Sequence, residues 1–476
     1  MAVLAVVLTA TSQGYGFHRD ELYFRMLEPA WGYVDQPPLT PLLARLMTGI
    51  ADEPWALRIP ATTSVVVAVL VLALITREVG GGRYAQGLCA WATAFAAFPL
   101  LFGHVLLSAS VDLVAWPLVC LFVLRAVLRA DPRWWLAVGA VIGLATYNKL
   151  LVGMLIAGLA VGVLAAGPRR VLREPLLWAG ALLAVAMAAP NLVYQVQNDW
   201  PQLAMGAALG ESNGEEVRVL TVPFLLLMLG PPLVPVWVAG VIAPWRRGSP
   251  LRDVRFVTIA LGVVTAATVA GGAQFYYPLG ILAVVFAIGC RPVAEWASSR
   301  RRHLRWTVVV AAVAVNAAVS TVIALPVIPL GVLGSTPVPA VNEVVAESVG
   351  WPTYVSQIAA VVSAARDSGG DPVVVTSNYG EAGAIARYGP GRGIDAVYSG
   401  HNHLWSTARP PDDATSAVFV GSMRPAVRDA FDGCRTATEL DNGLGVQGEE
   451  QGAAVTLCTG LRIAWSDLWP SIAHLD

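Results

Sequence analysis

Phe17-His18-Arg19-Asp20-Glu21-Leu22-Tyr23-Phe24 is the stretch on which the interpretation of this sequence depends. It lies within residues 14–58, a long polar interruption that also contains Gly-Tyr-Val-Asp-Gln-Pro-Pro-Leu at positions 32–39. Acids, arginines and aromatic residues are concentrated here between two apolar segments. Charged groups near hydrocarbon are costly and are usually retained for function. We therefore expect the chemistry of the protein to be centred on this loop.

The composition of the chain is that of an integral membrane protein. Of its 476 residues, 56% are hydrophobic and only 13% are charged, whereas soluble domains carry about 25% charged residues. The formal net charge of −1 predicts no nucleic-acid partner. The expected surroundings of the chain are therefore a lipid bilayer.

Apolar segments recur along the first part of the chain and predict a helical bundle of about eleven spans, given that a span needs ~20 apolar residues. The first segment is short, and a cleaved signal is the alternative to a first span. The segments are residues 1–10, 59–76, 84–107, 111–128, 134–148, 150–166, 175–196, 219–243, 256–271, 275–290 and 306–330.

Arginines gather in alternate loops, which predicts the orientation of the chain. By the positive-inside rule these loops are cytoplasmic, so residues 14–58 and everything beyond about residue 334 lie on the outer side. The arginines are Arg77 and Arg83; Arg125, Arg129 and Arg133; Arg169, Arg170 and Arg173; Arg246, Arg247, Arg252 and Arg255; and Arg291, Arg300, Arg301, Arg302 and Arg305.

The polar loop itself is expected to contain two short helices. Residues 20–30 suit a helix that begins with acids, and the apolar side chains at positions 39, 42, 43, 46 and 47 share one face of a second helix. Such a stripe is typical of a helix in the membrane interface. The Asp35-Gln36-Pro37-Pro38 turn between them should direct its side chains toward the first helix.

The composition changes after the last apolar segment. Strand-length runs at residues 372–376, 417–420 and 453–457 alternate with helix-like stretches at 355–366, 381–388 and 425–431. This alternation predicts a membrane domain at residues 1–333 and an extracytoplasmic α/β domain at residues 340–476. Cys434 and Cys458 could pair there if the compartment is oxidising.

The predicted outer face carries groups suited to the transfer of a sugar from a lipid-linked phosphate. A carboxylate can act as general base toward an acceptor hydroxyl, while cations and tyrosine hydroxyls can bind a departing phosphate. The candidates are the acids Asp20, Glu21, Asp35 and Asp112, the cations Arg58 and Lys149, and the tyrosines Tyr276 and Tyr277.

Four motifs resemble the dolichyl-phosphate-mannose protein mannosyltransferase family (glycosyltransferase family 39), whose bacterial relatives include the lipid A aminoarabinose transferases. They are the Asp20-Glu21 pair, the turn at residues 32–39, Ser-Ala-Ser-Val-Asp at 108–112 and Phe-Tyr-Tyr-Pro at 275–278. The similarity covers roughly residues 1–330. A looser likeness to actinobacterial members continues through Tyr-Gly-Glu-Ala at 379–382 and Ser-Gly-His-Asn at 399–402.

The resemblance implies a GT-C membrane fold, a polyprenyl-phosphate sugar donor and an inverting displacement at the outer membrane face. It implies that Asp20 is the base, with Glu21 beside it, and that Tyr276 or Tyr277 contacts the donor phosphate. Two positions depart from the family. Gln36 and Gln274 stand where relatives often have lysine, so Lys149, Arg58 or Arg218 would have to compensate, or the donor differs from the familiar ones.

Simpler interpretations remain open at each site. Asp20 and Asp112 could cap helices, Lys149 could extend to the interface, and the tyrosines could belong to an aromatic belt. A His-Asn-His run at 401–403 is a weak metal motif, and the sequence leaves a need for a divalent metal open.

The sequence thus predicts a plasma-membrane hexosyl- or pentosyltransferase that uses a polyprenyl-phosphate-linked sugar. Its acceptor would be a hydroxyl on a protein, glycan or lipid. A lipid or sugar transporter or flippase and a non-catalytic envelope scaffold are the alternatives. The glycosyltransferase prediction differs from these alternatives in requiring that the acids and Lys149 meet in one cavity.

Overall fold

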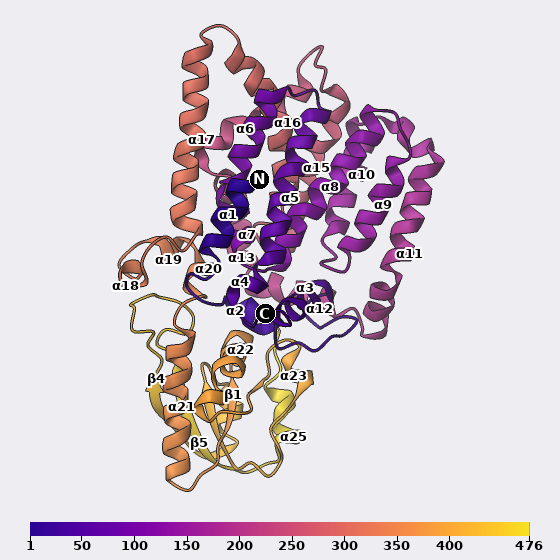
Figure 1. Ribbon diagram of the computed structural model, residues 1–476. Coiled ribbons are helices and arrows are strands. Elements are labelled where there is room, and N and C mark those ends of the chain that lie inside the picture. Colours follow the sequence, from indigo (N-terminus) through magenta and orange to yellow (C-terminus); the bar gives the residue numbers. More distant parts are fainter. Residues whose placement is uncertain (476) are drawn as a thin grey trace.

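The computed structural model describes residues 1–475 and consists of a bundle of apolar helices with a smaller α/β domain at one end (Figure 1). The bundle contains α1 (Ala2–Thr11), α5 (Ile59–Glu78), α6 (Arg83–Ala94), α7 (Ala97–His104), α8 (Ser108–Leu128), α9 (Trp134–Ala145), α10 (Val152–Ala166), α11 (Pro175–Gln197), α13 (Gly214–Leu227), α14 (Val234–Ile242), α15 (Arg255–Gly271), α16 (Leu279–Ser298) and α17 (Arg302–Ala324). Short helices α2 (Arg19–Phe24), α3 (Leu39–Thr48), α4 (Pro54–Leu57) and α12 (Pro201–Ser212) lie between the bundle and the domain.

Every apolar segment expected from the sequence is helical. Among residues 1–475, six helices are long and apolar enough to cross a membrane, or up to eight if each of two bent pairs is one span. The pairs are α6 with α7, bent by 57°, and α13 with α14, bent by 67°. The remaining segments are α1, α9 and α10, which are shorter than ~20 residues. The eleven expected spans thus correspond to six long helices, two bent pairs and three helices that are shorter than a span needs, so the structure supports six to eight spans among residues 1–475.

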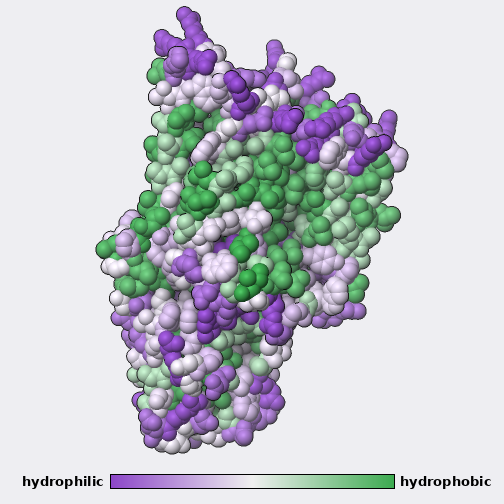
Figure 2. Space-filling model, viewed as in Figure 1, coloured by the Kyte–Doolittle hydropathy of each residue, from purple (hydrophilic) through white to green (hydrophobic). Residues whose placement is uncertain are grey.

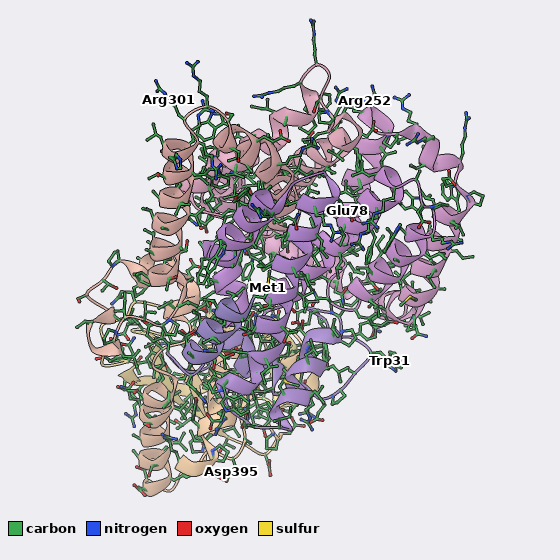
Figure 3. All side chains as sticks on the ribbon, turned by 45° about the horizontal axis from the view of Figure 1, so that its top comes forward. Met1, Trp31, Glu78, Arg252, Arg301 and Asp395 are labelled. Carbon is green, nitrogen blue, oxygen red and sulfur yellow. A yellow bond between two sulfur atoms is a disulfide. The ribbon has the colours of Figure 1, made fainter. Side chains whose placement is uncertain are left out.

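The surface of the bundle carries a broad apolar band with hydrophilic groups above and below it (Figure 2). Arg252 and Arg301 lie at one end of the molecule, and Asp395 of the C-terminal domain lies at the other (Figure 3). The loops rich in arginine are thus separated from the C-terminal domain by the apolar band.

Small residues set the closest helix contacts in the bundle. A Cβ atom placed on Gly139 of α9 would lie 2.0 Å from the carbonyl oxygen of Gly180 in α11. Between membrane helices, packing rather than the hydrophobic effect drives association, so such small-residue contacts are favoured. Glycine at these two positions lets α9 and α11 pack backbone against backbone.

A five-stranded sheet organises the C-terminal domain, with strand order β2-β1-β3-β5-β4. The inner strand β1 is parallel to both β2 and β3, whereas β5 is antiparallel to β3 and β4. The elements are α21 (Trp351–Asp367), β1 (Val373–Thr376), α22 (Tyr379–Tyr388), β2 (Tyr398–Ser399), α23 (Leu404–Thr407), β3 (Ser416–Val420), α24 (Pro425–Arg428), β4 (Phe431–Glu439), β5 (Ala454–Leu461) and α25 (Trp465–Leu468). Helices α18 (Leu330–Leu333), α19 (Val338–Val341) and α20 (Glu343–Ala346) connect it to the bundle.

Alternate side chains of the strands pack on opposite faces of this sheet, as the period of two requires. Val374 and Val418 join a core with α21 and α22, while Val375 and Phe419 join a second core with the tryptophan of α25, Trp465. The mainly helical membrane bundle with a C-terminal α/β domain is therefore confirmed.

The polar loop of residues 14–58 packs against both parts of the molecule. Phe17 and Leu22 share a core with α21 and α22, whereas Tyr33 and Phe24 share one with Ala61 of α5. Helix α3 agrees with the expected amphipathic helix. Helix α2, expected over residues 20–30, ends at Phe24. Pro29 disfavours helical backbone at the residue before it, so the helix could not continue to residue 30.

The two cysteines of the C-terminal domain form a disulfide. Cys434 of β4 and Cys458 of β5 are direct partners in the antiparallel ladder, with Cα atoms 4.1 Å apart. The pairing that the sequence allowed is therefore present.

Candidate active site

A cavity of about 500 Å³ lies where the bundle meets the C-terminal domain, and we call it the Asp20 cavity. Seven of the residues singled out from the sequence line it. They are Asp20, Asp35, Gln36, Lys149, Gln274, Tyr276 and Tyr277. Acids from the first loop thus share one cavity with the single lysine of the chain and with the Tyr-Tyr step.

Helix α2 holds Asp20 in its first turn. The N-cap residue is His18, whose Nδ1 accepts a hydrogen bond from the Asp20 N–H at 3.1 Å. The Glu21 carboxylate accepts one from the His18 N–H at 2.9 Å, which completes a capping box. The alternative interpretation, that Asp20 caps the helix, is therefore excluded. Its Oδ1 instead accepts a hydrogen bond from the Tyr379 hydroxyl at 2.9 Å.

Tyr379 reaches Asp20 because α22 packs closely on α2. A Cβ atom on Gly383 would lie 2.7 Å from the backbone of Leu22, so only glycine fits there. The Arg19 guanidinium also lies over the Tyr379 ring, 4.7 Å from its centroid. The C-terminal domain is thus docked on the loop that carries Asp20 and contributes a side chain to the cavity.

Glu21 is buried beneath the cavity and does not line it. Arg58 Nε and Nη2 each donate to Glu21 at 3.0 Å, and both side chains are about 1% exposed or less. The other Arg58 donors contact His104 and backbone carbonyls within residues 12–16, and the Leu106 N–H donates to Glu21. Glu21, expected to be catalytic, and Arg58, expected to bind substrate, therefore do not line the Asp20 cavity, and their polar atoms are engaged in internal contacts.

Asp35 is held by its neighbours at the edge of the cavity. Its Oδ1 accepts a hydrogen bond from the Tyr23 hydroxyl at 2.9 Å, and its Oδ2 accepts one from Gln36 Nε2 at 3.0 Å. Burial, with a smaller contribution from the Asp20 charge, raises the pKa of Asp35 to about 6. The centroids of the Tyr23 and Tyr379 rings lie 4.8 Å apart. The tyrosine bonded to Asp35 therefore contacts the tyrosine bonded to Asp20.

We expect any activity that depends on the geometry of the Asp20 cavity to fall as the pH drops through about 6, because protonated Asp35 loses an acceptor for Tyr23 or Gln36. The pKa of the folded state lies above the ordinary 3.8, so folding binds this proton. The contribution of Asp35 to stability therefore decreases as the pH rises from about 4 to about 6. A profile of kcat/KM against pH measures the effect. Asp35→Asn should remove the limb near pH 6, and an unchanged limb would contradict this role.

Asp112 lies in a small hollow beside the main cavity. Tyr276 and Tyr277 line both this hollow and the Asp20 cavity. The Asp112 carboxylate accepts a hydrogen bond from Asn148 Nδ2 at 2.9 Å. The N-cap of α8 is Leu107, so the alternative interpretation, that Asp112 caps this helix, is excluded.

Lys149 is directed at the tyrosines of the Tyr-Tyr step. Its Nζ lies 6.0 Å from the ring centroid of Tyr276 and 5.6 Å from that of Tyr277. Gln274 lines the same cavity. A cation therefore lines the same cavity as Gln274.

Among the polar lining residues that were not named as site candidates are Tyr379, Asn402 and Gln202. Tyr379 and Asn402 come from the C-terminal domain and lie in the two motifs that carried the looser family likeness. Gln202, at the start of α12, is different, because no motif marked it. Within residues 1–475, neither its buried side-chain oxygen nor its buried nitrogen has a hydrogen-bond partner.

The described chain offers no evident metal centre. Across residues 1–475, no three or more His, Cys, Asp or Glu side chains are grouped so that they could hold a metal ion. No residue is therefore assigned to a divalent metal.

Comparison with known families agrees with the resemblance found in the sequence. The family model described as dolichyl-phosphate-mannose-protein mannosyltransferase matches residues 35–194, which include Asp35, Asp112 and Lys149. No protein of curated function matches the chain by sequence. The expected family relation is confirmed over the matched segment.

Solved structures share the fold of the whole chain. ArnT from Cupriavidus metallidurans in the apo state is 14% identical, with a TM-score of 0.58 over 100% of this chain and 98% of that one. The same protein bound to undecaprenyl phosphate is 15% identical, with a TM-score of 0.57 over the same shares. The mycobacterial arabinofuranosyltransferase AftD is 15% identical, with a TM-score of 0.52 over 96% of this chain and 40% of that one.

Proposed function

The chain resembles the dolichyl-phosphate-mannose-protein mannosyltransferases and has the fold of ArnT. We propose that this protein is a membrane glycosyltransferase. It moves a sugar from a polyprenyl phosphate to a hydroxyl acceptor. The observation that carries this proposal is the convergence of Asp20 and Lys149 on one cavity. A transporter would place its charged residues near the bilayer midplane, whereas these lie at the end of the bundle that meets the C-terminal domain.

The donor phosphate binds beside Lys149. An ammonium group and tyrosine hydroxyls are suitable donors for a phosphate and stabilise its charge as it departs. Apolar side chains of the same cavity, including Leu151, Met154 and Leu203, offer a surface for the isoprenoid chain. The undecaprenyl phosphate bound to ArnT supports this class of donor.

Asp20 acts as the base toward the acceptor. It takes the proton of the acceptor hydroxyl, whose oxygen forms a bond to the anomeric carbon of the sugar while the bond from that carbon to the phosphate oxygen breaks. The polyprenyl phosphate leaves with the electron pair, and the anomeric configuration inverts. The Tyr379 hydroxyl, hydrogen-bonded to Oδ1, fixes the orientation of the carboxylate and leaves Oδ2 for the acceptor.

The cavity opens on the outer face of the plasma membrane. The arginine-rich loops lie at the opposite end of the bundle (Figure 3), which the positive-inside rule assigns to the cytoplasm. The disulfide between Cys434 and Cys458 supports an oxidising compartment for the C-terminal domain.

Replacing Lys149 by Met tests the donor site. We expect the Kd for undecaprenyl phosphate to rise about 10- to 100-fold, because a hydrogen bond to a charged group contributes about 1.5–3 kcal/mol. Calorimetric titration of the purified protein in detergent measures the Kd. Arg218→Gln is the matched control, since Arg218 is exposed on α13 and does not line the cavity. Equal affinities of Lys149→Met and the wild type would contradict the proposed donor site.

A further inference from the structure

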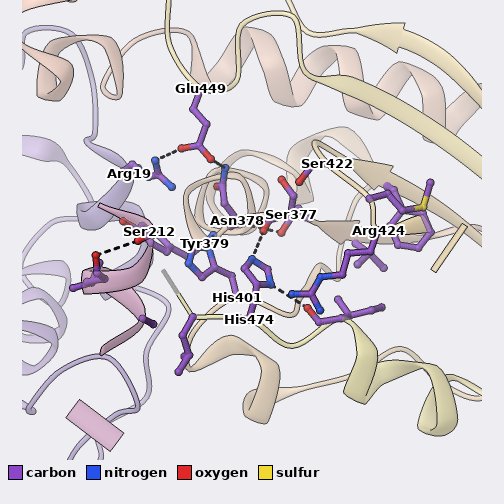
Figure 4. Close-up of a pocket in the computed structure, with 18 of the residues that line it drawn as sticks. Arg19, Ser212, Ser377, Asn378, Tyr379, His401, Ser422, Arg424, Glu449 and His474 are labelled. Carbon is purple, nitrogen blue, oxygen red and sulfur yellow. Dashed lines mark hydrogen bonds and ion pairs between the residues drawn. The ribbon is translucent and has the colours of Figure 1, made fainter. Parts of the chain in front are cut away.

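A second cavity, of about 920 Å³, lies between the sheet of the C-terminal domain and α12 (Figure 4). We call it the sheet cavity. It is formed at the carboxyl ends of β1 and β3, where Ser377 follows β1 and Ser422 follows β3. Strand β1 lies between β2 and β3. From β1 the chain passes through α22 to β2, and it later returns to form β3 on the other side of β1. In open α/β sheets, ligands bind in the crevice at such a switch point.

The sheet cavity adjoins the Asp20 cavity. Leu209, Gln274 and Tyr379 line both of them. Arg19 lines the sheet cavity and Asp20, the next residue, lines the other. A molecule held in the sheet cavity can therefore extend past Tyr379 to the carboxylate of Asp20.

The helix terminus that borders the sheet cavity is already satisfied, which argues against an anionic ligand. The backbone N–H groups of Ser377 and Asn378 donate to the Glu381 carboxylate at 2.9 and 3.1 Å. The N–H of Tyr379 donates to His401 Nδ1 at 3.2 Å. A phosphate at this terminus would have to displace a carboxylate of its own helix. The cavity is thus not a nucleotide or phosphate site of the usual kind.

Charges on the wall of the sheet cavity are mixed. Arg19 contacts Glu347 at 3.2 Å and also Glu449, and Asn378 Nδ2 donates to Glu449 at 3.1 Å (Figure 4). Arg19 is 9% exposed, and within residues 1–475 its buried Nε has no hydrogen-bond partner. Arg424 and Glu211 line the cavity as well, so its wall carries basic and acidic side chains together. Donors and acceptors of both kinds suit a neutral ligand with many hydroxyls.

Flat rings complete this wall. The His401 ring lies 4.8 Å from that of Tyr379 and 4.6 Å from that of His474. A peptide that bound by adding a strand would need a sheet edge, whereas β1 and β3 are inner strands of the sheet. A lipid would need a continuous apolar groove, and this wall is rich in hydroxyl, imidazole and charged groups.

We propose that the sheet cavity is the acceptor subsite and that it binds a neutral glycan, the terminal hydroxyl of which reaches Asp20 past Tyr379. This inference rests on the proposed glycosyltransferase function and names its acceptor class. It makes the C-terminal domain the part of the protein that selects the acceptor, while the membrane bundle binds the donor.

Filling the sheet cavity tests this assignment. Ser422→Trp places a large side chain at its rim, and Ser406→Trp, on the exposed face of α23 and outside the cavity, is the matched control. With neutral linear oligosaccharides as acceptors, Ser422→Trp should raise the acceptor KM about tenfold or more, the loss expected for one or two hydrogen bonds. The Kd for undecaprenyl phosphate should not change in either variant.

Two outcomes overturn the inference while the proposed function stands, and a third result concerns the function itself. Equal acceptor KM values for Ser422→Trp and Ser406→Trp would place the acceptor elsewhere. Competition by serine- and threonine-rich peptides, with none by oligosaccharides, would assign the cavity to a protein acceptor. If the wild type transfers no sugar and binds no undecaprenyl phosphate, the proposed function fails. Calorimetry with the oligosaccharides alone then decides the inference, since binding weakened by Ser422→Trp supports the subsite and absence of binding refutes it.

Discussion

Asp20→Asn should reduce sugar transfer about 100- to 10,000-fold, the usual contribution of a positioned general base. Asparagine keeps the oxygen that accepts the Tyr379 hydrogen bond, so the packing of α22 on α2 is retained. It cannot take the acceptor proton. The change is therefore expected in kcat, measured with purified protein in detergent, rather than in the affinity for the donor.

Two controls define this result. Glu28→Gln alters an acid of the same loop that is exposed and paired only with Arg45, and it should retain activity. The melting temperature and the Kd for undecaprenyl phosphate of Asp20→Asn should equal those of the wild type. Turnover of Asp20→Asn within a few-fold of the wild-type rate would remove Asp20 from the mechanism.

Glu21→Ala should instead destabilise the protein, by about 3–5 kcal/mol, because it leaves the Arg58 guanidinium buried without its counter-ion. The hydrogen bonds from the His18 and Leu106 N–H groups would be lost as well. We expect a low yield of folded protein and a clear fall in melting temperature. Thermal unfolding followed by size-exclusion chromatography in detergent measures both.

Removing both charges should not restore stability fully. A double change of Glu21 and Arg58 to apolar residues relieves the unpaired charge, but the carbonyl oxygens of Ser12 and Gly16 lose their donor. Buried acceptors without donors cost free energy of their own. If Glu21→Gln melted like the wild type and yet transferred no sugar, Glu21 would be catalytic and the contrast with Asp20 would be wrong.

The apolar segments of the bundle could be predicted because each helix shows a long hydrophobic run. The C-terminal sheet was harder. Strands β1, β3 and β5 are apolar and were expected, whereas β4 (Phe431–Glu439) is mostly exposed and carries alternating polar residues. It is held by its ladder with β5 and by the disulfide. The helix-like stretch at 425–431 is consequently shorter than expected, since α24 ends at Arg428 and β4 begins at Phe431.

The candidate site could be predicted in part. Asp20, Lys149 and Tyr277 were recognisable as polar residues next to apolar segments, and the structure brings them together. Composition could not separate Asp20 from Glu21, because neighbours on a helix point about 100° apart and only the fold decides which faces the cavity. Tyr379 depends on the docking of a distant domain, which no local pattern encodes.

The central claim is that the Asp20 cavity transfers sugars from a polyprenyl phosphate, and single-turnover transfer measures it most directly. Purified wild-type protein in detergent is mixed with a panel of radiolabelled undecaprenyl-phosphate sugars and neutral oligosaccharides, and the release of undecaprenyl phosphate is followed. We predict that at least one donor is consumed, with label appearing in the oligosaccharide, and that Asp20→Asn binds the same donor without consuming it. Equal consumption of that donor by the wild type and Asp20→Asn would contradict the account.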